Sequence, residues 1–290
     1  MRVVSLVPSA TEIIAALGLA DQLVGRSHEC TYPPEVQTVP VVSASRVDTA
    51  ELSSADIDRA VRDALADGRP LYAVDGELLE RLAPDLIVTQ DLCEVCAVSS
   101  GEVKRVSHIE VETVSLDPRD LHEIEESIRT IARHLDAAAR GEQLAQDMHH
   151  RIDFVHQLVR GLPRQRVFVA EWLDPPFAAG HWVPEMVDMA GGDEVLGEPR
   201  ERSFATTWEA VAEAAPQLVV LAPCGFDLER TVSEAGVVPP LAARIVAVDG
   251  DAAYSRPGPR VAEGVAQLAH LLHPDDVEAP ALPSRELKAL

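Results

Sequence analysis

The chain alternates between two patterns of apolar and polar positions. Short runs rich in β-branched residues predict strands, and segments with apolar residues at helical spacing separate them. The predicted strands are Val3–Val7, Leu23–Gly25, Leu86–Thr89, Val111–Val114, Val167–Ala170, Leu218–Leu221 and Ile245–Val248. The predicted helices are roughly Ser9–Leu17, Ser53–Ala66, Gly76–Leu82, Arg119–His134, Ala137–Leu158, Pro184–Met189, Trp208–Ala214 and Pro259–Leu271. This alternation is typical of parallel sheets with crossover helices, so we expect an α/β fold.

Two local signals mark the ends of the pattern. Pro8 and Ser9 predict a turn and the N-cap of the first helix, with Glu12 three residues after the serine as in a capping box. Beyond His273, prolines lie among acidic residues, and we expect a loose tail over residues 274–290.

Two sequence units recur in the same order in each half of the chain. Thr11–Gly18 resembles Pro184–Gly191, and Leu82–Thr89 resembles Ala214–Leu221. Any helix-turn-strand unit has some of this character, but the shared order and the Ala-Pro before the second strand of each pair favour two similar lobes.

A helical segment separates the two halves. Ala137–Leu158 has no strong stop signal except Gly141, and a helix of that length spans roughly 33 Å, enough to bridge two lobes. We therefore predict two Rossmann-like lobes with parallel sheets, joined by a long rigid helix. The expected boundaries are an N-terminal lobe over 1–116, a helical linker over 117–161 and a C-terminal lobe over 162–273.

Charge and hydropathy narrow the choice of partners. The 25 Lys and Arg residues against 48 Asp and Glu give a net charge of −23, which repels phosphate backbones, so we expect no nucleic-acid partner. Solubility alone also explains such a surface. No run approaches the length of a membrane span. The apolar run Val3–Val7 stops at Pro8, so it predicts a strand rather than a secretory leader, and we expect a cytoplasmic location.

The opening motif Val4-Ser5-Leu6-Val7-Pro8-Ser9-Ala10-Thr11-Glu12, the motif Leu82-Ala83-Pro84-Asp85-Leu86-Ile87 and the helical bridge resemble helical-backbone (class III) substrate-binding proteins. Within that group the chain is most similar to the cobalamin-binding proteins of ATP-driven (ABC) importers, over roughly residues 2–272. The resemblance implies two α/β lobes, a rigid linking helix, a small-molecule ligand of corrinoid type held at the carboxyl ends of the strands, and an ABC permease as partner. The strand-end rule for open α/β sheets gives the same location for the ligand.

All four cysteines follow predicted strands. They are Cys30, Cys93, Cys96 and Cys224, and Cys93 and Cys96 form a Cys-x-x-Cys pair. Four thiolates from converging loops suit a tetrahedral zinc ion or an iron–sulfur cluster. Buried or incidental thiols and, less favourably, a redox pair are the alternatives. His28 is a further candidate ligand, although a lone histidine is more often structural.

Aromatic and charged residues also gather in the predicted strand-end loops. Large flat rings suit a flat, partly apolar ligand such as a corrin, although packing of the loops explains the aromatic residues equally well. An arginine near a helix N-terminus attracts a carboxylate or phosphate group of a ligand, although a structural salt bridge explains the arginine equally well. Glu171 and His181 are candidates for proton exchange. The candidate ligand-binding residues are Pro8, Ser9, His28, Glu171, Trp172, Phe177, His181, Trp182, Phe226, Tyr254 and Arg256.

Two functions remain open from the sequence. One is binding of a cobalamin-type corrinoid or metal chelate in a cleft between the lobes. The other is a cytosolic metal or iron–sulfur protein that uses the same scaffold and binds its metal through Cys30, Cys93, Cys96 and Cys224. Such a protein would be an enzyme if its metal or cluster contacts a substrate. A corrinoid, a cluster and zinc are therefore all candidate cofactors, and the sequence does not decide between them.

Overall fold

The computed structural model describes residues 1–47, 49, 51–91, 98–106 and 109–287. The chain divides into two compact units, which we call the first and the second unit. The first unit comprises Met1–Leu52, Asp56–Pro118 and Glu125–Ala145, and the second comprises Ser53–Ala55, Arg119–Ile124 and Gln146–Leu290.

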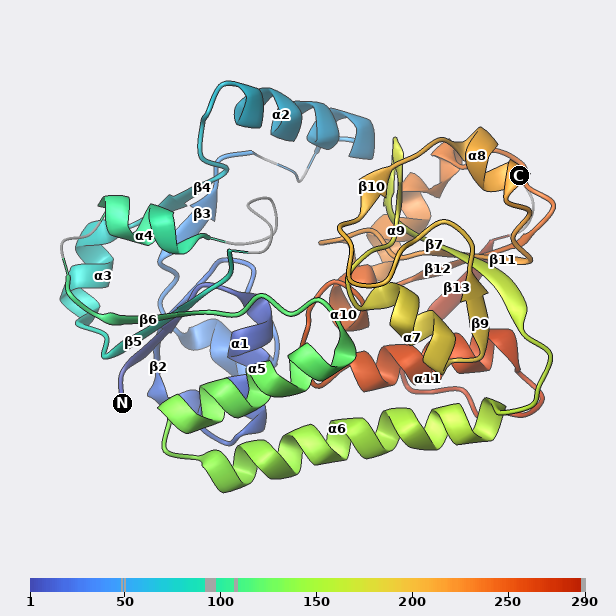
Figure 1. Cartoon of the computed structure of the whole chain (residues 1–290). Coiled ribbons are helices and arrows are strands. Elements are labelled where there is room, and N and C mark those ends of the chain that lie inside the picture. The colour runs from blue at the N-terminus through green and yellow to red at the C-terminus, as the bar shows by residue number, and fades with distance from the viewer. Residues whose placement is uncertain (48, 50, 92–97, 107–108, 288–290) are drawn as a thin grey trace. The chain divides into compact units, whose positions relative to one another are not determined.

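A parallel four-stranded sheet forms the centre of the first unit (Figure 1). Its strands lie in the order β2 (Leu23–Arg26), β1 (Val3–Ser5), β5 (Leu86–Thr89) and β6 (Glu112–Ser115), and every neighbouring pair is parallel. Strands β1 and β5 are buried along their whole length, which explains why they are apolar except at their last residues, Ser5 and Thr89. Because the strands are parallel, the loops after them leave from one edge of the sheet.

Helices and a small hairpin complete the first unit. The hairpin pairs β3 (Ser43–Ser45) with β4 (Tyr72–Val74) in antiparallel register. The helices that contribute to this unit are α1 (Pro8–Ala16), α2 (Ser54–Ala66), α3 (Gly76–Leu82), α4 (Ser100–Val106), α5 (Leu121–His134) and α6 (Ala138–Val159). Its apolar core includes Val4, Leu6, Leu79 and Ile87.

A mixed sheet forms the centre of the second unit. Its strands are β7 (Gln165–Leu173), β8 (Pro176–Ala178), β9 (Gly192–Glu194), β10 (Phe204–Ala205), β11 (Leu218–Leu221), β12 (Arg244–Val248) and β13 (Ser284–Leu287). Strands β7, β11 and β12 are parallel neighbours, so the loops that follow them share one sheet edge. The helices that belong wholly to this unit are α7 (Val183–Met189), α8 (Trp208–Glu213), α9 (Leu228–Glu234), α10 (Gly250–Ala253) and α11 (Val261–Leu272).

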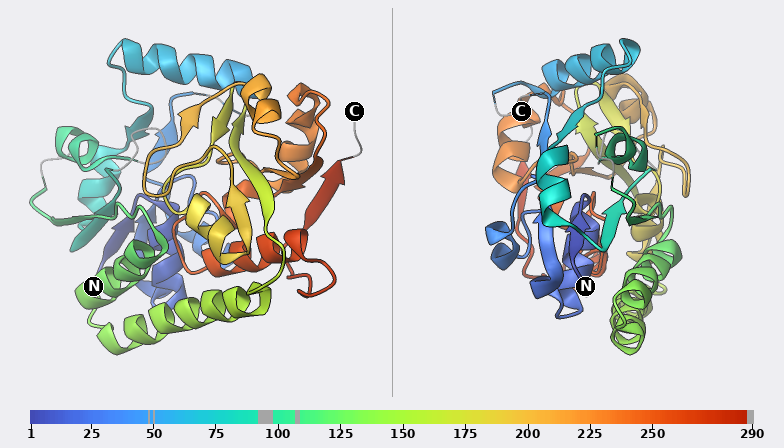
Figure 2. Two further views of the ribbon diagram at one scale, coloured as in Figure 1. Left: turned by 45° about the vertical axis from the view of Figure 1, so that its right-hand side comes forward. Right: turned by 90° about the vertical axis from the view of Figure 1, so that its left-hand side faces the viewer.

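The predicted helical linker is present but does not form a separate domain. Helix α6 is 22 residues long, as the sequence indicated, and runs from the first unit into the second. Helix α5 is also divided between the units, so residues 117–161 belong partly to each. Helices α5 and α6 lie side by side in both views of Figure 2, and a Cβ atom on Gly141 would come within 2.2 Å of the Ala132 Cβ. Gly141 therefore allows the two helices to approach closely.

The predicted parallel strands and their crossover helices form close to the expected boundaries, and the two-lobed α/β prediction is confirmed. The repeated sequence segments form the same kinds of element in both halves of the chain. One repeated segment forms helix α1 in one half and helix α7 in the other. The second repeated segment forms α3 and β5 in one half, and α8 and β11 in the other. Short elements escaped prediction, namely α4, α9, α10, β3, β4, β8, β9, β10 and β13.

Two local expectations differ from the structure. The first helix has Val7 as its N-cap with no side-chain cap bond, because Pro8 occupies the first helical position and Ser9 lies inside the helix. The segment 274–290, expected to be loose, contains β13, which pairs with β12 from Ser284 to Leu287. Gln267 also donates to the carbonyls of Leu282 and Pro283, which ties this part of the segment to α11.

Candidate functional site

The loops at the strand-end edge of the first unit carry its candidate residues. Pro8 and Ser9 follow β1, but both are buried at the start of α1. His28 follows β2 and is half-buried, with 27% of its side chain exposed. Among the described candidates of this unit, His28 is thus the one whose side chain reaches the surface.

The buried side chain of Arg26 anchors the loop around His28. Arg26 is 8% exposed, and its guanidinium donates to the carbonyl oxygens of Ser27, Cys30 and Gln37 at 3.1 to 3.2 Å. Hydrogen bonds from a buried cation to carbonyl oxygens are among the stronger ones in proteins. Arg26 therefore fixes the backbone on both sides of His28.

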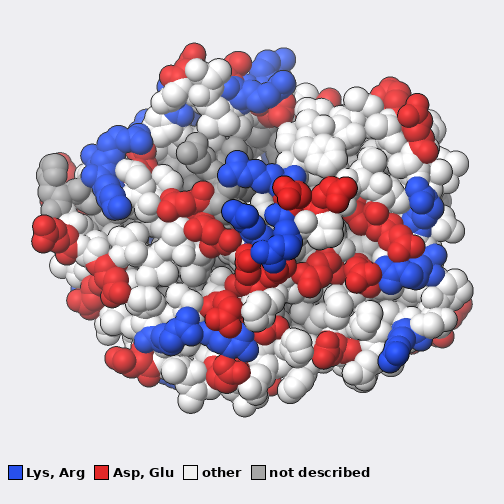
Figure 3. All heavy atoms as spheres, viewed as in Figure 1, with Lys and Arg blue, Asp and Glu red and all other residues white. Residues whose placement is uncertain are grey.

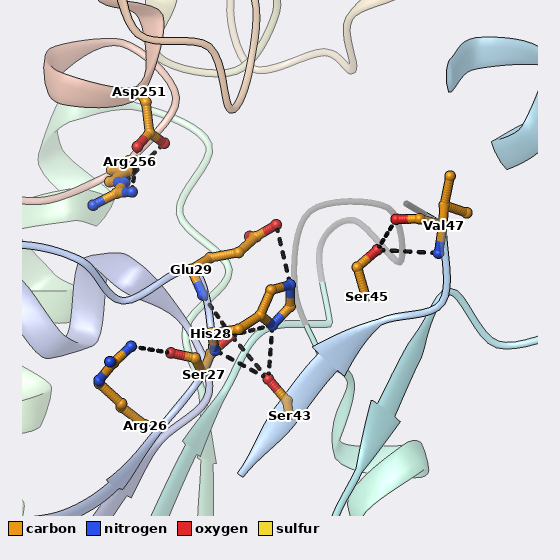
Figure 4. A network of polar contacts seen from close by, with 9 residues as sticks. All are labelled: Arg26, Ser27, His28, Glu29, Ser43, Ser45, Val47, Asp251 and Arg256. Atoms are coloured by element: carbon orange, nitrogen blue, oxygen red, sulfur yellow. Dashed lines mark hydrogen bonds and ion pairs between the residues drawn. The ribbon is translucent and has the colours of Figure 1, made fainter. Parts of the chain in front are cut away.

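Two serines hold one edge of the His28 imidazole (Figure 4). The Nδ1 atom lies 3.0 Å from the Ser43 Oγ and 3.4 Å from the Ser27 Oγ, while the Ser43 hydroxyl donates to the Ser27 Oγ at 3.1 Å. The Nε2 atom lies 3.7 Å from the Glu29 Oε1, which is longer than a hydrogen bond. The Tyr72 ring lies against the imidazole, with centroids 5.8 Å apart.

Electrostatics favour a neutral His28. Burial lowers the pKa of its imidazole, and the nearby Arg26 cation lowers it further. A neutral imidazole is the form that acts as a metal ligand or a base. The neighbouring Ser43 is only 6% exposed, and its hydroxyl is hydrogen-bonded to the Ser27 Oγ. Ser43, His28 and Glu29 therefore do not form a catalytic set with an accessible serine nucleophile.

The cysteines do not form a described cluster. Cys30 is fully buried, with its thiol 3.8 Å from the Ser5 carbonyl oxygen, which fits the alternative of a core thiol. Cys224 is a half-buried free thiol in the second unit. Cys93 and Cys96 lie outside the described residues. Within the described residues, no three His, Cys, Asp or Glu side chains are grouped so as to hold a metal ion.

In the second unit, Glu171 and Trp172 lie at the end of β7 and Phe177 lies in β8, rather than in the loop that the sequence predicted, and all three are half-buried. The Glu171 carboxylate accepts the N–H of Gly180 at 3.3 Å. Trp172 and Phe177 are register partners where β7 and β8 pair. This hairpin therefore brings two aromatic side chains together.

A second aromatic contact joins the end of β7 to the loop after β11. The rings of Trp172 and Phe226 are 5.1 Å apart, and the Arg230 guanidinium lies 4.6 Å above the Phe226 ring. The Trp172 Nε1 donates to the Ser54 carbonyl at 3.1 Å, and the Glu234 carboxylate accepts the Ser54 N–H at 3.1 Å. Ser54 and both of its partners belong to the second unit, so these bonds lie within that unit.

Two further aromatic candidates are interior residues of the second unit. Trp182 is 6% exposed and donates its Nε1–H to the Tyr254 carbonyl at 2.8 Å. Tyr254 is 1% exposed, and its hydroxyl donates to the Gln267 side chain at 2.9 Å. Both rings therefore support the loops rather than line their surface.

His181 has an unusual local environment. Its backbone is left-handed at φ +52, its ring lies 5.7 Å from that of Trp182, and its Nε2 atom is buried without a hydrogen-bond partner. Burial lowers the pKa of the imidazole, with smaller contributions from Arg202 and Arg119. His181 and Glu171 both come from the β7–β8 region, but no direct bond between them is present among the described contacts.

Arg256 forms a salt bridge with Asp251, five residues before it. It is 6% exposed, its Nε donates to the Asp251 Oδ1 at 2.9 Å, and a second guanidinium nitrogen pairs with the other Asp251 oxygen (Figure 4). This is the salt-bridge alternative that the sequence left open. A bidentate pair of this kind orders the turn before α11.

Several residues of these sites were missed from the sequence. Ser43 and Arg26 organise His28, yet Ser43 lies in a short hairpin strand that gave no period-two pattern. A charged residue at the end of a buried strand, directly before Ser27-His28-Glu29-Cys30, was the available signal for Arg26. The partner Ser54 of Trp172 is 118 residues away in sequence, and no local signal connects them.

Charge is mixed rather than segregated on the face shown in Figure 3, where basic side chains lie among acidic and uncharged ones. In the described part of the chain, no helix combines the length and apolar character that crossing a membrane requires.

The chain has two α/β units, and the long helix α6 runs through both. Aromatic and polar residues lie at or after the carboxyl ends of the parallel strands, which is where ligands bind in open α/β sheets. The chain belongs to the periplasmic binding protein family, whose model matches residues 3–248.

Curated relatives align over most of the chain. An ABC transporter substrate-binding lipoprotein of Bacillus subtilis is 25% identical, and the alignment covers 94% of this chain and 80% of the relative. A vitamin B12-binding protein of Pectobacterium atrosepticum is 23% identical, with coverage of 93% and 88%.

Solved structures share the fold. A periplasmic heme-binding protein of Pseudomonas aeruginosa superposes with a TM-score of 0.71 at 19% identity, covering 99% of this chain and 95% of that one. The periplasmic vitamin B12-binding protein of Vibrio cholerae gives a TM-score of 0.67 at 21% identity, with coverage of 93% and 96%.

These comparisons correct two expectations. The cytoplasmic location is wrong, because the relatives are named as periplasmic proteins or as a lipoprotein of an importer, which points outside the cytoplasm. The sequence reasoning failed because it used the first residues as a guide to location. The alternative of a cytosolic iron–sulfur enzyme finds no support among the relatives.

Proposed function

We propose that this protein is the binding component of an ATP-driven importer, that it works outside the cytoplasm, and that its ligand is a metallo-tetrapyrrole of the cobalamin or haem type. The observation that carries the proposal is family membership across residues 3–248, together with relatives named for vitamin B12 and structural neighbours named for heme and vitamin B12. A membrane permease is the partner that follows from this role.

The hairpin of β7 and β8 in the second unit suits such a ligand. Trp172 and Phe177 are half-buried, and they offer apolar surface to the flat face of a macrocycle. Trp182, Tyr254 and Arg256 are buried, so in this proposal they hold the loops in shape. Binding and release need no chemical step, and the protein acts through shape and surface.

Absorbance and tryptophan-fluorescence titrations of the purified protein with cobalamin, ferric haem and a ferric siderophore test the proposal. We expect one equivalent of a tetrapyrrole to bind at micromolar concentration or below. Phe177→Ala should weaken binding by about tenfold, the amount that corresponds to about 1.4 kcal/mol of lost ring contact.

The control for this variant is Trp208→Phe, because the Trp208 ring packs in the core against Phe168 at 6.1 Å. It should leave the affinity unchanged. Binding of the siderophore alone, or of none of the three compounds at micromolar concentration, would sink the proposal.

A further inference from the structure

We propose that Arg230 and Glu234, on helix α9, are positioning residues that fix the indole of Trp172 in the orientation in which it meets the ligand. The inference rests on the proposed function and adds to it the residues that set the direction of the ring.

Trp172 lies in a closed cycle of contacts, formed by side chains and backbone groups of the second unit. The indole lies against the Phe226 ring, with 5.1 Å between centroids. The Arg230 guanidinium lies over the Phe226 ring at 4.6 Å and pairs with the Glu234 carboxylate at 3.6 Å. Glu234 accepts the N–H and the hydroxyl of Ser54 at 3.1 and 3.2 Å, and the Ser54 carbonyl accepts the Trp172 Nε1–H at 3.1 Å. The contacts therefore return to the indole at which they begin.

The local sequence of α9 explains why Arg230 and Glu234 act together. They are four residues apart, which places both side chains on the same face of the helix. Asp227 is the N-cap of α9 and accepts the Arg230 N–H at 2.8 Å. Because Phe226 directly precedes this N-cap, the start of the helix also fixes the place of Arg230 beside the Phe226 ring.

Most of the cycle is shielded from water. Ser54 is fully buried and Phe226 is 4% exposed, while the side chains of Glu234 and Arg230 are 16% and 26% exposed. Hydrogen bonds and ion pairs in such surroundings are stronger than at an open surface, and networks of them hold their members rigid. The indole is thus held both through its ring and through its N–H group.

This arrangement decides what Trp172 can offer a ligand. The indole has one polar group, Nε1–H, and that group is already bonded to Ser54, so the half-buried ring presents apolar surface. A side chain that is fixed before binding loses little conformational freedom when the ligand arrives, and this raises affinity. Arg230 and Glu234 therefore act on binding through Trp172.

The test measures the affinity of the full-length protein for cobalamin and ferric haem after substitutions on α9. Arg230→Met removes the cation and keeps an unbranched side chain, and Glu234→Ala removes the acceptor of the Ser54 hydrogen bonds. Each should weaken binding by about three- to tenfold, the range expected when one side chain must be immobilised on binding. Arg230→Lys keeps a cation, so its affinity should lie between those of Arg230→Met and the unsubstituted protein.

A double-mutant cycle with Trp172→Ala separates positioning from a general structural effect. In this background Arg230→Met and Glu234→Ala should no longer change the affinity, because the ring on which they act is absent. If Trp172→Ala does not fold, Trp172→Leu provides the same comparison with a smaller change in volume.

Acrylamide quenching of tryptophan fluorescence reports on the ring without any ligand. The difference between proteins with and without Trp172 isolates its signal from the other two tryptophans. Arg230→Met and Glu234→Ala should both increase the quenching of Trp172, because they release the indole. Glu229→Ala is the matched control, since Glu229 lies on the same helix but pairs with Arg285 at 2.6 Å, outside the cycle. It should change neither the affinity nor the quenching.

The outcomes separate the two proposals. Affinities of Arg230→Met and Glu234→Ala equal to that of the unsubstituted protein would overturn the positioning role and leave the proposed function in place. Equal losses of affinity with and without Trp172, or unchanged quenching, would overturn it as well, because the two residues would then act elsewhere. Failure of the unsubstituted protein to bind either compound would overturn the proposed function and any role of these residues in binding.

Discussion

Ala83 and Ala215 occupy matching positions in the two units, and both have left-handed backbones, at φ +41 and φ +47. Each ends a helix and precedes a proline that leads into a central strand. In the first unit Arg2 donates to the carbonyls of Leu82 and Ala83, and in the second Arg166 donates to those of Ala214 and Ala215. The sequence echo is therefore a repeated structural device, in which an arginine satisfies the last carbonyls of a helix.

Replacing either alanine with glycine should stabilise the protein. A left-handed conformation costs an L-residue about 1–2 kcal/mol, whereas the extra freedom of glycine in the unfolded chain costs about 0.4–1 kcal/mol. We expect Ala83→Gly and Ala215→Gly each to raise the free energy of unfolding by about 0.5–1 kcal/mol, measured by denaturant titration.

Ala212→Gly is the matched control for this pair, because Ala212 is an exposed position within α8 and lacks a positive φ. It should lose about 1 kcal/mol. A loss of similar size at Ala83 or Ala215 would show that the left-handed geometry carries no strain.

Gly141 should not tolerate a side chain. A Cβ atom there would lie 2.2 Å from the Ala132 Cβ, so α5 and α6 must move apart to accept it. We expect Gly141→Ala to lower the free energy of unfolding by about 1–3 kcal/mol, since overpacking of a tight contact has that cost.

The comparison variant is Gly236→Ala, at a glycine with open space around its Cβ position. It should be neutral or slightly stabilising. Equal melting temperatures for the two variants would mean that the α5–α6 contact is not tight.

Glu194 gives stability a specific pH dependence. Its Oε1 accepts the N–H groups of Val195, Leu196 and Gly197 at 3.1 to 3.3 Å, and its Oε2 accepts that of Val169 at 3.1 Å. Burial nevertheless outweighs these bonds and raises the pKa of this carboxyl from 4.5 to about 7.

The folded protein therefore keeps this proton to a higher pH than the unfolded chain does. The stabilising contribution is complete below the ordinary pKa of 4.5 and is lost as the pH rises through about 7. The loss amounts to about 3 kcal/mol, at about 1.4 kcal/mol per pH unit. Glu194→Gln cannot ionise, so its free energy of unfolding should lack this fall between pH 5 and 8.

Denaturant titrations at several pH values measure the difference. Glu198→Gln, at an exposed position in the same loop, should keep the pH dependence of the unsubstituted protein. Parallel pH profiles for Glu194→Gln and the unsubstituted protein would contradict the assignment.

The sequence predicted the central strands because buried parallel strands have continuous apolar runs, as in Leu86–Thr89 and Leu218–Leu221. It predicted the long helix because Ala138–Val159 keeps helix formers throughout. It missed β3 and β13 because short strands with exposed residues have no apolar period, and their pairing partners decide them.

The candidate site was harder to predict for the same reason. Placing His28 after a strand required only the strand pattern, whereas Trp172, expected in a loop, lies within β7, and the surroundings of both depend on distant residues. Ser43 meets His28 across 15 positions and Ser54 meets Trp172 across 118. The burial of Trp182 and Tyr254 could not be seen either, because an aromatic residue in a predicted loop has the same sequence signature whether it lines a site or supports it.

The most direct test of tetrapyrrole binding is native mass spectrometry of the purified protein, mixed with equal amounts of cobalamin, ferric haem, a ferric siderophore and ferric citrate. The prediction is a complex of one protein with a tetrapyrrole, which survives competition from the other compounds. A spectrum that shows only the free protein, or a complex with the siderophore or citrate alone, would contradict it.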